Sequence, residues 1–179
     1  MSTLRLAIFA VWIAFGVYWL VSAFGTKEGS RTSRARAPGL VVILAFALLR
    51  VFKGDTLAVH TLILEVVGTI LFASGIAFAV WARIYLGRNW GMPMTQKDEP
   101  ELVTSGPYRY VRHPIYSGIL LAILGTALAT NIYWLITFVV LGVYFVYSAT
   151  VEEKLLTTTF PSTYPSYRSR TKMLIPFVL

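Results

Sequence analysis

Long stretches of apolar residues with almost no charge are the feature that most constrains how this chain can fold. Residues 4–24 contain one charged side chain, Arg5, and residues 57–86 continue the apolar pattern over 30 positions. About 20 apolar residues in a helix cross the hydrocarbon core of a bilayer, which is about 30 Å thick. Helices and closed barrels are the structures that satisfy every backbone hydrogen bond inside lipid. These stretches therefore predict an all-α, polytopic membrane protein.

Five apolar stretches are expected to form transmembrane helices. They are residues 4–24, 38–52, 57–86, 114–129 and 132–151. The first is interpreted as a retained helix, because it lacks the short apolar core and the cleavage site of a signal peptide. Beyond Val151 the fifth stretch continues without glycine or proline until Pro161. This pattern predicts a fifth helix that leaves the membrane and ends near Phe160.

The length of 179 residues favours a single membrane domain over residues 1–179. We expect two spanning helices within residues 1–56 and a catalytic core over residues 57–179. The core is expected to consist of a loop, a helical hairpin and a tail. Their residues are 87–113, 114–151 and 152–179.

Composition excludes several classes of protein. Charged residues make up 13% of the chain, against about 25% in soluble domains. Because cysteine is absent, a disulfide scaffold, a thiolate metal site and a catalytic thiol are excluded. The two histidines, His60 and His113, are too few for a His-rich metal site, so no metal is expected. The net charge of +8 is attributed to cytoplasmic loops rather than to a nucleic-acid partner.

The distribution of basic residues predicts the orientation in the membrane. Five spans place the two termini on opposite sides. With the N-terminus outside, 13 of the 16 basic residues face the cytoplasm, and Arg5, Arg50 and Lys53 lie outside. Basic residues concentrate in cytoplasmic loops. We therefore expect loop 87–113, the C-terminus and the active site to be cytoplasmic.

A cluster of polar residues begins the expected fourth helix. Pro114 is well placed at the first helical position, which makes His113 the N-cap. The positive end of the helix, Arg112 and His113 together favour an anion such as a carboxylate or phosphate. Tyr116 lies one turn along on the same face. Gly118 permits a ligand or a neighbouring helix to approach closely, and the small-residue pattern from Gly118 to Ala129 predicts close helix packing.

Glu152 and Glu153 form an acidic pair at the end of the fifth span, on a face that is otherwise basic. The pair can bind a cation or amine, or it can form salt bridges with Arg168 or Arg170. An anion receptor and an acidic pair at neighbouring helix ends suit a zwitterion, such as an amino-acid moiety. The sequence does not decide which of the two glutamates would hold the ammonium.

Three motifs in this part of the chain resemble the isoprenylcysteine carboxyl methyltransferase family, which is similar to the phospholipid N-methyltransferases. They are LGRNW at 86–90, RHPIYSG at 112–118 within the run from residue 102, and the Glu152–Glu153 pair. The tail continues the resemblance. Its matching residues are Phe160, Tyr164, Tyr167, Arg170 and Pro176. The resemblance covers about residues 81–178.

The resemblance implies an S-adenosyl-L-methionine site at the cytoplasmic ends of helices three to five and the tail, with S-adenosyl-L-homocysteine as product. The implied cofactor-binding residues are Leu102, Val103, Gly106, Pro107, Tyr108, His113, Tyr116, Gly118, Glu152 and Glu153. The implied substrate-binding residues are Arg83, Trp90, Tyr167 and Arg170. The implied catalytic residues are Arg170, Glu152 and Arg112, with Arg170 expected to orient an acceptor carboxylate.

The resemblance also implies the reaction, which is methylation of a lipophilic or prenylated acceptor that enters from the bilayer. Membrane lipids are expected to surround the protein. Carboxyl O-methylation, as in isoprenylcysteine methyltransferases, needs no base, so alignment supplies most of the rate. The alternative is N-methylation of a phospholipid or lipid amine, with Glu152 or Glu153 as proton acceptor. Alternatives of other classes are a nicotinamide-dependent sterol-reductase-like protein and a non-catalytic membrane protein. The short chain disfavours the reductase, and the retained polar motifs disfavour a non-catalytic protein.

Overall fold

The computed structural model describes residues 3–24, 29–31, 57–91, 95–97 and 99–176. Its elements are α1 (Thr3–Ala23), β1 (Gly29–Arg31), α3 (Leu62–Leu86), η2 (Gly87–Asn89), β2 (Thr95–Lys97), η3 (Gly106–Arg109), α4 (Pro114–Ala129), α5 (Trp134–Thr159) and α6 (Tyr164–Arg170). The two strands pair antiparallel as a short ribbon. Apart from this ribbon, the regular structure of the described residues is helical, as the apolar stretches predict.

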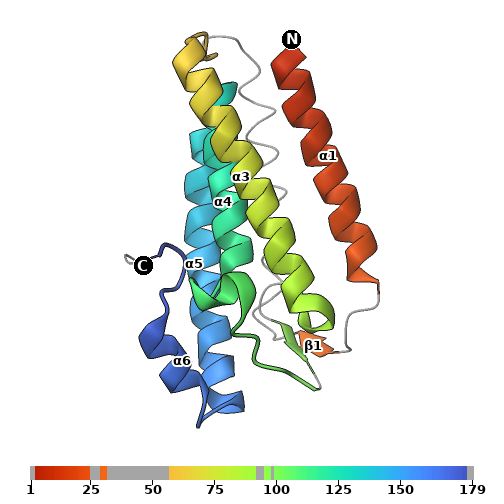
Figure 1. Cartoon of the computed structure of the whole chain (residues 1–179), viewed down its shortest axis with the longest axis vertical. Helices are drawn as coiled ribbons and strands as arrows, with labels where there is room; N and C mark the ends of the chain where they lie inside the picture. Colours follow the sequence, from red (N-terminus) through yellow and green to blue (C-terminus); the bar gives the residue numbers. More distant parts are fainter. Residues whose placement is uncertain (1–2, 25–28, 32–56, 92–94, 98, 177–179) are drawn as a thin grey trace.

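The long helices form a bundle whose polar elements gather at one end (Figure 1). Helices α1, α3 and α5 run toward that end, and α4 runs away from it. The last turns of α1 and α3 and the part of α5 around Glu153 therefore lie at the same end of the bundle as the first turn of α4. The ribbon, η3 and α6 lie at the same end. This arrangement confirms that loop 87–113 and the tail meet, as one site built from three helix ends requires.

Three helices in the described part of the chain are long and apolar enough to cross a membrane. They are α1, α3 with η2, and α5. Helix α4 is also apolar but has 16 residues, so it is shorter than an ordinary span. The second predicted span, residues 38–52, lies outside the described residues. The fold is thus that of a helical membrane protein, and the count of five spans stays a prediction.

The helix boundaries follow the sequence pattern except at the start of α3. Proline begins α4 at Pro114 with His113 as N-cap, and Phe160 is the C-cap of α5, so both expectations are confirmed. The third apolar stretch begins at residue 57, but α3 begins at Leu62. The preceding residues instead pair with the turn between α4 and α5, where Val59 N donates to Thr130 O at 3.1 Å.

The sequence pattern does not predict helix α6, whose residues belong to the expected tail. It has seven residues, and a helix this short depends on tertiary contacts rather than on propensity. Tyr164 and Tyr167 provide those contacts, because both are buried. They lie three positions apart, which places them on one face of the helix.

Glycines bring the backbones of α3 and α4 into direct contact. Gly75 of α3 faces Gly118 of α4, and Gly68 faces Gly125. A Cβ atom added at Gly118 would lie 2.6 Å from the backbone nitrogen of Ala79 and 2.7 Å from the oxygen of Gly75. Small residues at such interfaces allow close helix association in membranes. The close packing predicted for the fourth helix is confirmed.

We predict that Gly75→Ala lowers the free energy of unfolding in detergent micelles by about 1–3 kcal/mol, the usual cost of overpacking. The new methyl group would lie 2.6 Å from Gly118 O, so the helices must separate. Gly16→Ala is the matched control, since nothing lies within 4 Å of a Cβ atom there. Equal stability of the two variants would contradict the backbone contact.

Candidate functional site

Arg112 and Glu153 form a buried ion pair at the polar end of the bundle. Arg112 Nε donates to Glu153 Oε1 at 2.7 Å, and the side chains are 8% and 5% exposed. The guanidinium also donates to the backbone oxygens of Thr171 and Arg168. Arg168 lies 3.3 Å from the other oxygen of Glu153. Glu153 is therefore held between two arginines, and the salt-bridge interpretation of this residue is confirmed for Arg168.

The tail runs beside the start of α4 and is held by backbone hydrogen bonds. Arg112 N donates to Lys172 O at 2.8 Å, and His113 N donates to Met173 O at 3.0 Å. The hydroxyl of Ser117 donates to Leu174 O at 2.6 Å. The backbone N–H groups of Arg112 and His113 are thus occupied by the chain itself. An anion receptor at this helix start depends on side chains rather than on these two N–H groups.

Glu152 contacts a different set of side chains. The hydroxyl of Tyr116 donates to Glu152 Oε1 at 2.6 Å, and His113 Nδ1 lies 3.3 Å from Oε2. The Glu152 side chain is 23% exposed, so it is more accessible than Glu153. The three residues form what we call the Glu152 pole. It joins the first turn of α4 to α5, as the resemblance implies.

Parallel aromatic rings support the Glu152 pole. The ring of Tyr116 stacks on Phe145 with 4.4 Å between centroids and 6° between planes. It also stacks on His113, with 5.5 Å between centroids and 5° between planes. Such stacking restricts the Tyr116 ring, so its hydroxyl is held toward Glu152. The position of Tyr116 on the same face as His113 is confirmed.

Two opposing effects act on the imidazole of His113. Burial alone would lower the pKa of His113, but its contacts with the carboxylates of Glu152 and Glu153 outweigh burial and raise the pKa above the ordinary value. Its Nε2 atom is buried without a hydrogen-bond partner, although Glu153 Oε1 lies 3.5 Å away. Nε2 thus faces the Glu153 carboxylate at ion-pair distance, and Nδ1 faces Glu152.

The loop before α4 packs against α6, and its Tyr108 lies in the same buried cluster as Tyr116. Tyr167 of α6 donates its hydroxyl hydrogen to Tyr108 O at 2.6 Å. Gly106 has a φ of +57°, and a Cβ atom there would collide with the ring of Tyr85, so glycine is required. Pro107 and Tyr108 are buried, whereas Leu102 and Val103 are half-buried in the segment that leads to them.

Arg83 and Trp90 form a second pole, which we call the Arg83 pole. The guanidinium carbon of Arg83 lies 4.8 Å from the centroid of the Trp90 ring, a cation–π distance. Arg83 donates to Gly87 O at 2.8 Å and also to Ser22 O. The residue is 5% exposed, and its Nε has no hydrogen-bond partner. Among the described residues, no carboxylate pairs with this buried charge.

Tyr108 links the two poles. Burial raises the pKa of Tyr108 far above its ordinary value, with further increases from Tyr167 and the Glu152 carboxylate, whereas the Arg83 guanidinium lowers the pKa. Its hydroxyl is thus within electrostatic reach of both charged groups. Trp90, Tyr108 and Tyr116 also belong to one buried hydrophobic cluster. The two poles therefore border the same buried cluster.

The structure leaves two predicted site residues outside this arrangement. Arg170 is exposed, and its Nε donates to Ser166 O at 3.1 Å within α6. Gly118 contacts the backbone of α3, so its lack of a side chain is explained by helix packing. The sequence interpretation missed Phe145, whose apolar position inside a spanning helix carried no signal of a site. It also missed the carbonyl of Ser22, because backbone groups leave no trace in a motif.

Among the described residues, no group of three or more His, Cys, Asp or Glu side chains is arranged to hold a metal ion.

Comparison with known proteins identifies related sequences. The phospholipid methyltransferase family matches residues 63–163. Over 101 residues the chain is 38% identical to the Protein-S-isoprenylcysteine O-methyltransferase of Schizosaccharomyces pombe, a match that covers 54% of this chain and 43% of that protein. Over 94 residues it is 33% identical to the Cobalt-zinc-cadmium resistance protein CzcN of Cupriavidus metallidurans, covering 51% and 43%. The chain thus spans less than half the length of these relatives.

The family match includes both poles of the site, from Arg83 in α3 to Glu153 in α5. It extends over more than half of the chain, and three described helices are long and apolar enough to span a bilayer. The resemblance inferred from the sequence motifs is confirmed. The chain is a membrane protein that belongs to the phospholipid methyltransferase family.

Proposed function

We propose that this protein is an S-adenosylmethionine-dependent methyltransferase that methylates the carboxylate of a lipophilic acceptor. One observation carries the proposal: a partly exposed carboxylate, Glu152, and a buried guanidinium, Arg83, border the same buried cluster, through Tyr116 and Trp90 respectively. The first charge suits the ammonium of the cofactor, and the second suits an anionic acceptor. The Protein-S-isoprenylcysteine O-methyltransferase among the relatives supports a carboxylate acceptor.

The residues of the Glu152 pole fit the methionine end of the cofactor. Glu152 is the better partner for its ammonium, because Glu153 is already paired with Arg112 and Arg168. The resemblance assigns His113 to the amino-acid end of the cofactor, where its imidazole would contact the carboxylate. When bound, S-adenosylmethionine supplies an electrophilic methyl group on a sulfonium. Loop 102–108 would line the adenosine, as the family resemblance implies, and the ring of Tyr116 would bound the site near the methyl group.

The residues of the Arg83 pole fit an acceptor carboxylate. A buried guanidinium is costly unless an anion is paired with it, and Arg83 has neutral carbonyl partners in the described part of the chain. Arg83 would hold the acceptor as the ionised carboxylate, which needs no general base. Tyr108, Tyr116 and Trp90 would exclude water around the reacting atoms. Orientation by these fixed groups is then the main source of rate acceleration.

N-methylation of a lipid amine is the second candidate, favoured by the family's description as phospholipid methyltransferase. In that reaction Glu152 would take the proton that an ammonium acceptor must lose. The positive charge of Arg83 disfavours it, because a protonated amine would be repelled there. The buried Arg83 therefore places the carboxylate ahead of the amine.

We predict that Glu152→Gln weakens binding of S-adenosylhomocysteine tenfold or more, since a hydrogen bond to a charged group contributes about 1.5–3 kcal/mol. Glu153→Gln is the matched control on the neighbouring residue. It should lower stability, because it removes one partner of the buried pair with Arg112. Calorimetric titration and thermal unfolding measure the two effects. If Glu153→Gln folds but loses S-adenosylhomocysteine affinity while Glu152→Gln keeps it, Glu153 rather than Glu152 is the partner of the ammonium.

We predict that Arg83→Lys lowers kcat/KM for a prenylated cysteine acceptor about tenfold to a hundredfold and leaves S-adenosylhomocysteine affinity unchanged. Lysine keeps the charge but not the planar fork that binds a carboxylate. Arg170→Lys is tested in parallel, because Arg170 is the alternative partner of the acceptor. A loss of kcat/KM in Arg170→Lys alone would indicate that the acceptor carboxylate binds at the tail.

We propose that the polar end of the bundle faces the cytoplasm, with the N-terminus outside. The chain has no cysteine, so single cysteines at the exposed residues Ser105 and Ser166 are unambiguous probes. Both should be protected from a membrane-impermeant thiol reagent in intact cells and should react after permeabilisation. Reaction of both positions in intact cells would reverse the orientation.

A further inference from the structure

Helix α1 is weakly embedded in the rest of the structure. Ile8 is the buried residue along its length, and near its end Leu20 is 70% and Phe24 86% exposed. In the middle of the helix, Trp12 packs on Phe72 with centroids 5.7 Å apart and donates its indole hydrogen to Thr126. The C-terminal end of α1 contacts the bundle at the Arg83 pole.

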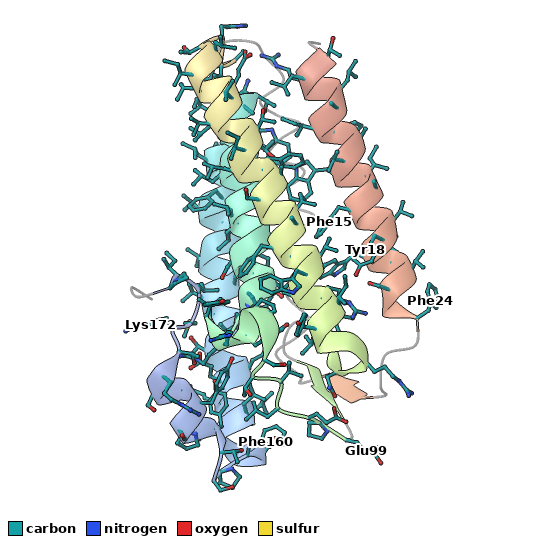
Figure 2. The ribbon with its side chains drawn as sticks, in the orientation of Figure 1. Phe15, Tyr18, Phe24, Glu99, Phe160 and Lys172 are labelled. Atoms are coloured by element: carbon teal, nitrogen blue, oxygen red, sulfur yellow. The ribbon has the colours of Figure 1, made fainter. Side chains whose placement is uncertain are left out.

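The contacts at that end enclose the buried guanidinium. Ser22 O accepts a hydrogen bond from Arg83. The ring of Trp19 meets the ring of Trp90 edge to face, with centroids 5.8 Å apart and planes at 88°. Figure 2 shows Tyr18 on the side of α1 that faces α3, and Phe24 pointing away. Trp90 is thus covered by Arg83 and by Trp19.

We propose that the last turns of α1, residues 18–23, form a wall of the acceptor site, and that Trp19 determines which lipid chain fits beside Arg83. The inference rests on the proposed function and concerns its acceptor. The contacts of Trp19 and Ser22 are with the Arg83 pole, where the acceptor carboxylate would lie. Leu20 and Phe24 add exposed apolar surface at the same end of α1, along which a hydrocarbon chain can lie.

The extent of the family match supports this assignment. The match covers residues 63–163, so it includes both poles but excludes α1. The family description refers to phospholipids, whereas one relative's name refers to isoprenylcysteine. Residues that select among different acceptors are expected outside the part that the members share. The wall formed by α1 lies outside the region that the family shares.

The test compares two tryptophans on the same helix. Trp19→Ala removes the ring at the Arg83 pole, and Trp12→Ala removes a ring about two turns away, in the middle of α1. Methyl transfer is measured for both variants with N-acetylcysteines carrying S-geranyl, S-farnesyl or S-geranylgeranyl groups. We expect Trp19→Ala to raise the kcat/KM ratio of the geranylgeranyl to the geranyl acceptor by about tenfold, the scale of hydrophobic pocket discrimination.

The controls separate the wall from a general effect on folding. Trp12→Ala should keep the wild-type kcat/KM ratio of the two acceptors. Trp19→Phe retains a ring, so its ratio should stay close to the wild-type value. Trp19→Leu gives a second variant that keeps apolar bulk, and S-adenosylhomocysteine binding reports folding of each protein. An unchanged ratio in both Trp19→Ala and Trp19→Leu, with wild-type transfer intact, would overturn this inference alone. Absence of transfer by the wild-type protein to all three acceptors would instead overturn the proposed carboxylate chemistry.

Discussion

The buried ion pair between Arg112 and Glu153 is the interaction on which the site depends. One guanidinium connects the start of α4, the end of α5 and the carbonyls of the tail. Removing one partner of such a pair leaves an uncompensated buried charge, at a cost of about 3–5 kcal/mol. Adjacent residues on a helix point about 100° apart. Fixing Glu153 on Arg112 therefore directs Glu152 toward Tyr116 and His113, where a ligand can meet it.

A second constraint sets the distance between the two poles. Arg83 lies on α3 and His113 precedes α4, and these helices touch through the backbones of Gly75 and Gly118. Close backbone contact leaves little room for one helix to shift against the other. The Arg83 guanidinium and the His113 imidazole are consequently held on rigid supports, as the proposed alignment of a methyl donor and an acceptor requires.

The sequence predicts the parts of this structure that depend on local chemistry. Apolar length identifies α1, α3 and α5, and the Arg-His-Pro order places the start of α4 at Pro114. The Glu152–Glu153 pair is correctly expected at the polar end, but its division of roles comes from tertiary contacts with Arg112 and Tyr116. The weight given to Arg170 came from the family resemblance alone, and the fold leaves its side chain exposed. Arg83 gains its importance from burial, which no spacing pattern encodes.

Methyl transfer itself tests the central claim most directly. Purified protein is incubated with S-adenosylmethionine labelled in its methyl group and with a total lipid extract, and the labelled lipid is then treated with base. The account predicts labelled lipid from which base releases the label, because the product of carboxylate methylation is an ester. Label that resists base would indicate an amine product and contradict the role of Arg83. No transfer, in a preparation that binds S-adenosylhomocysteine, would contradict a lipophilic acceptor altogether.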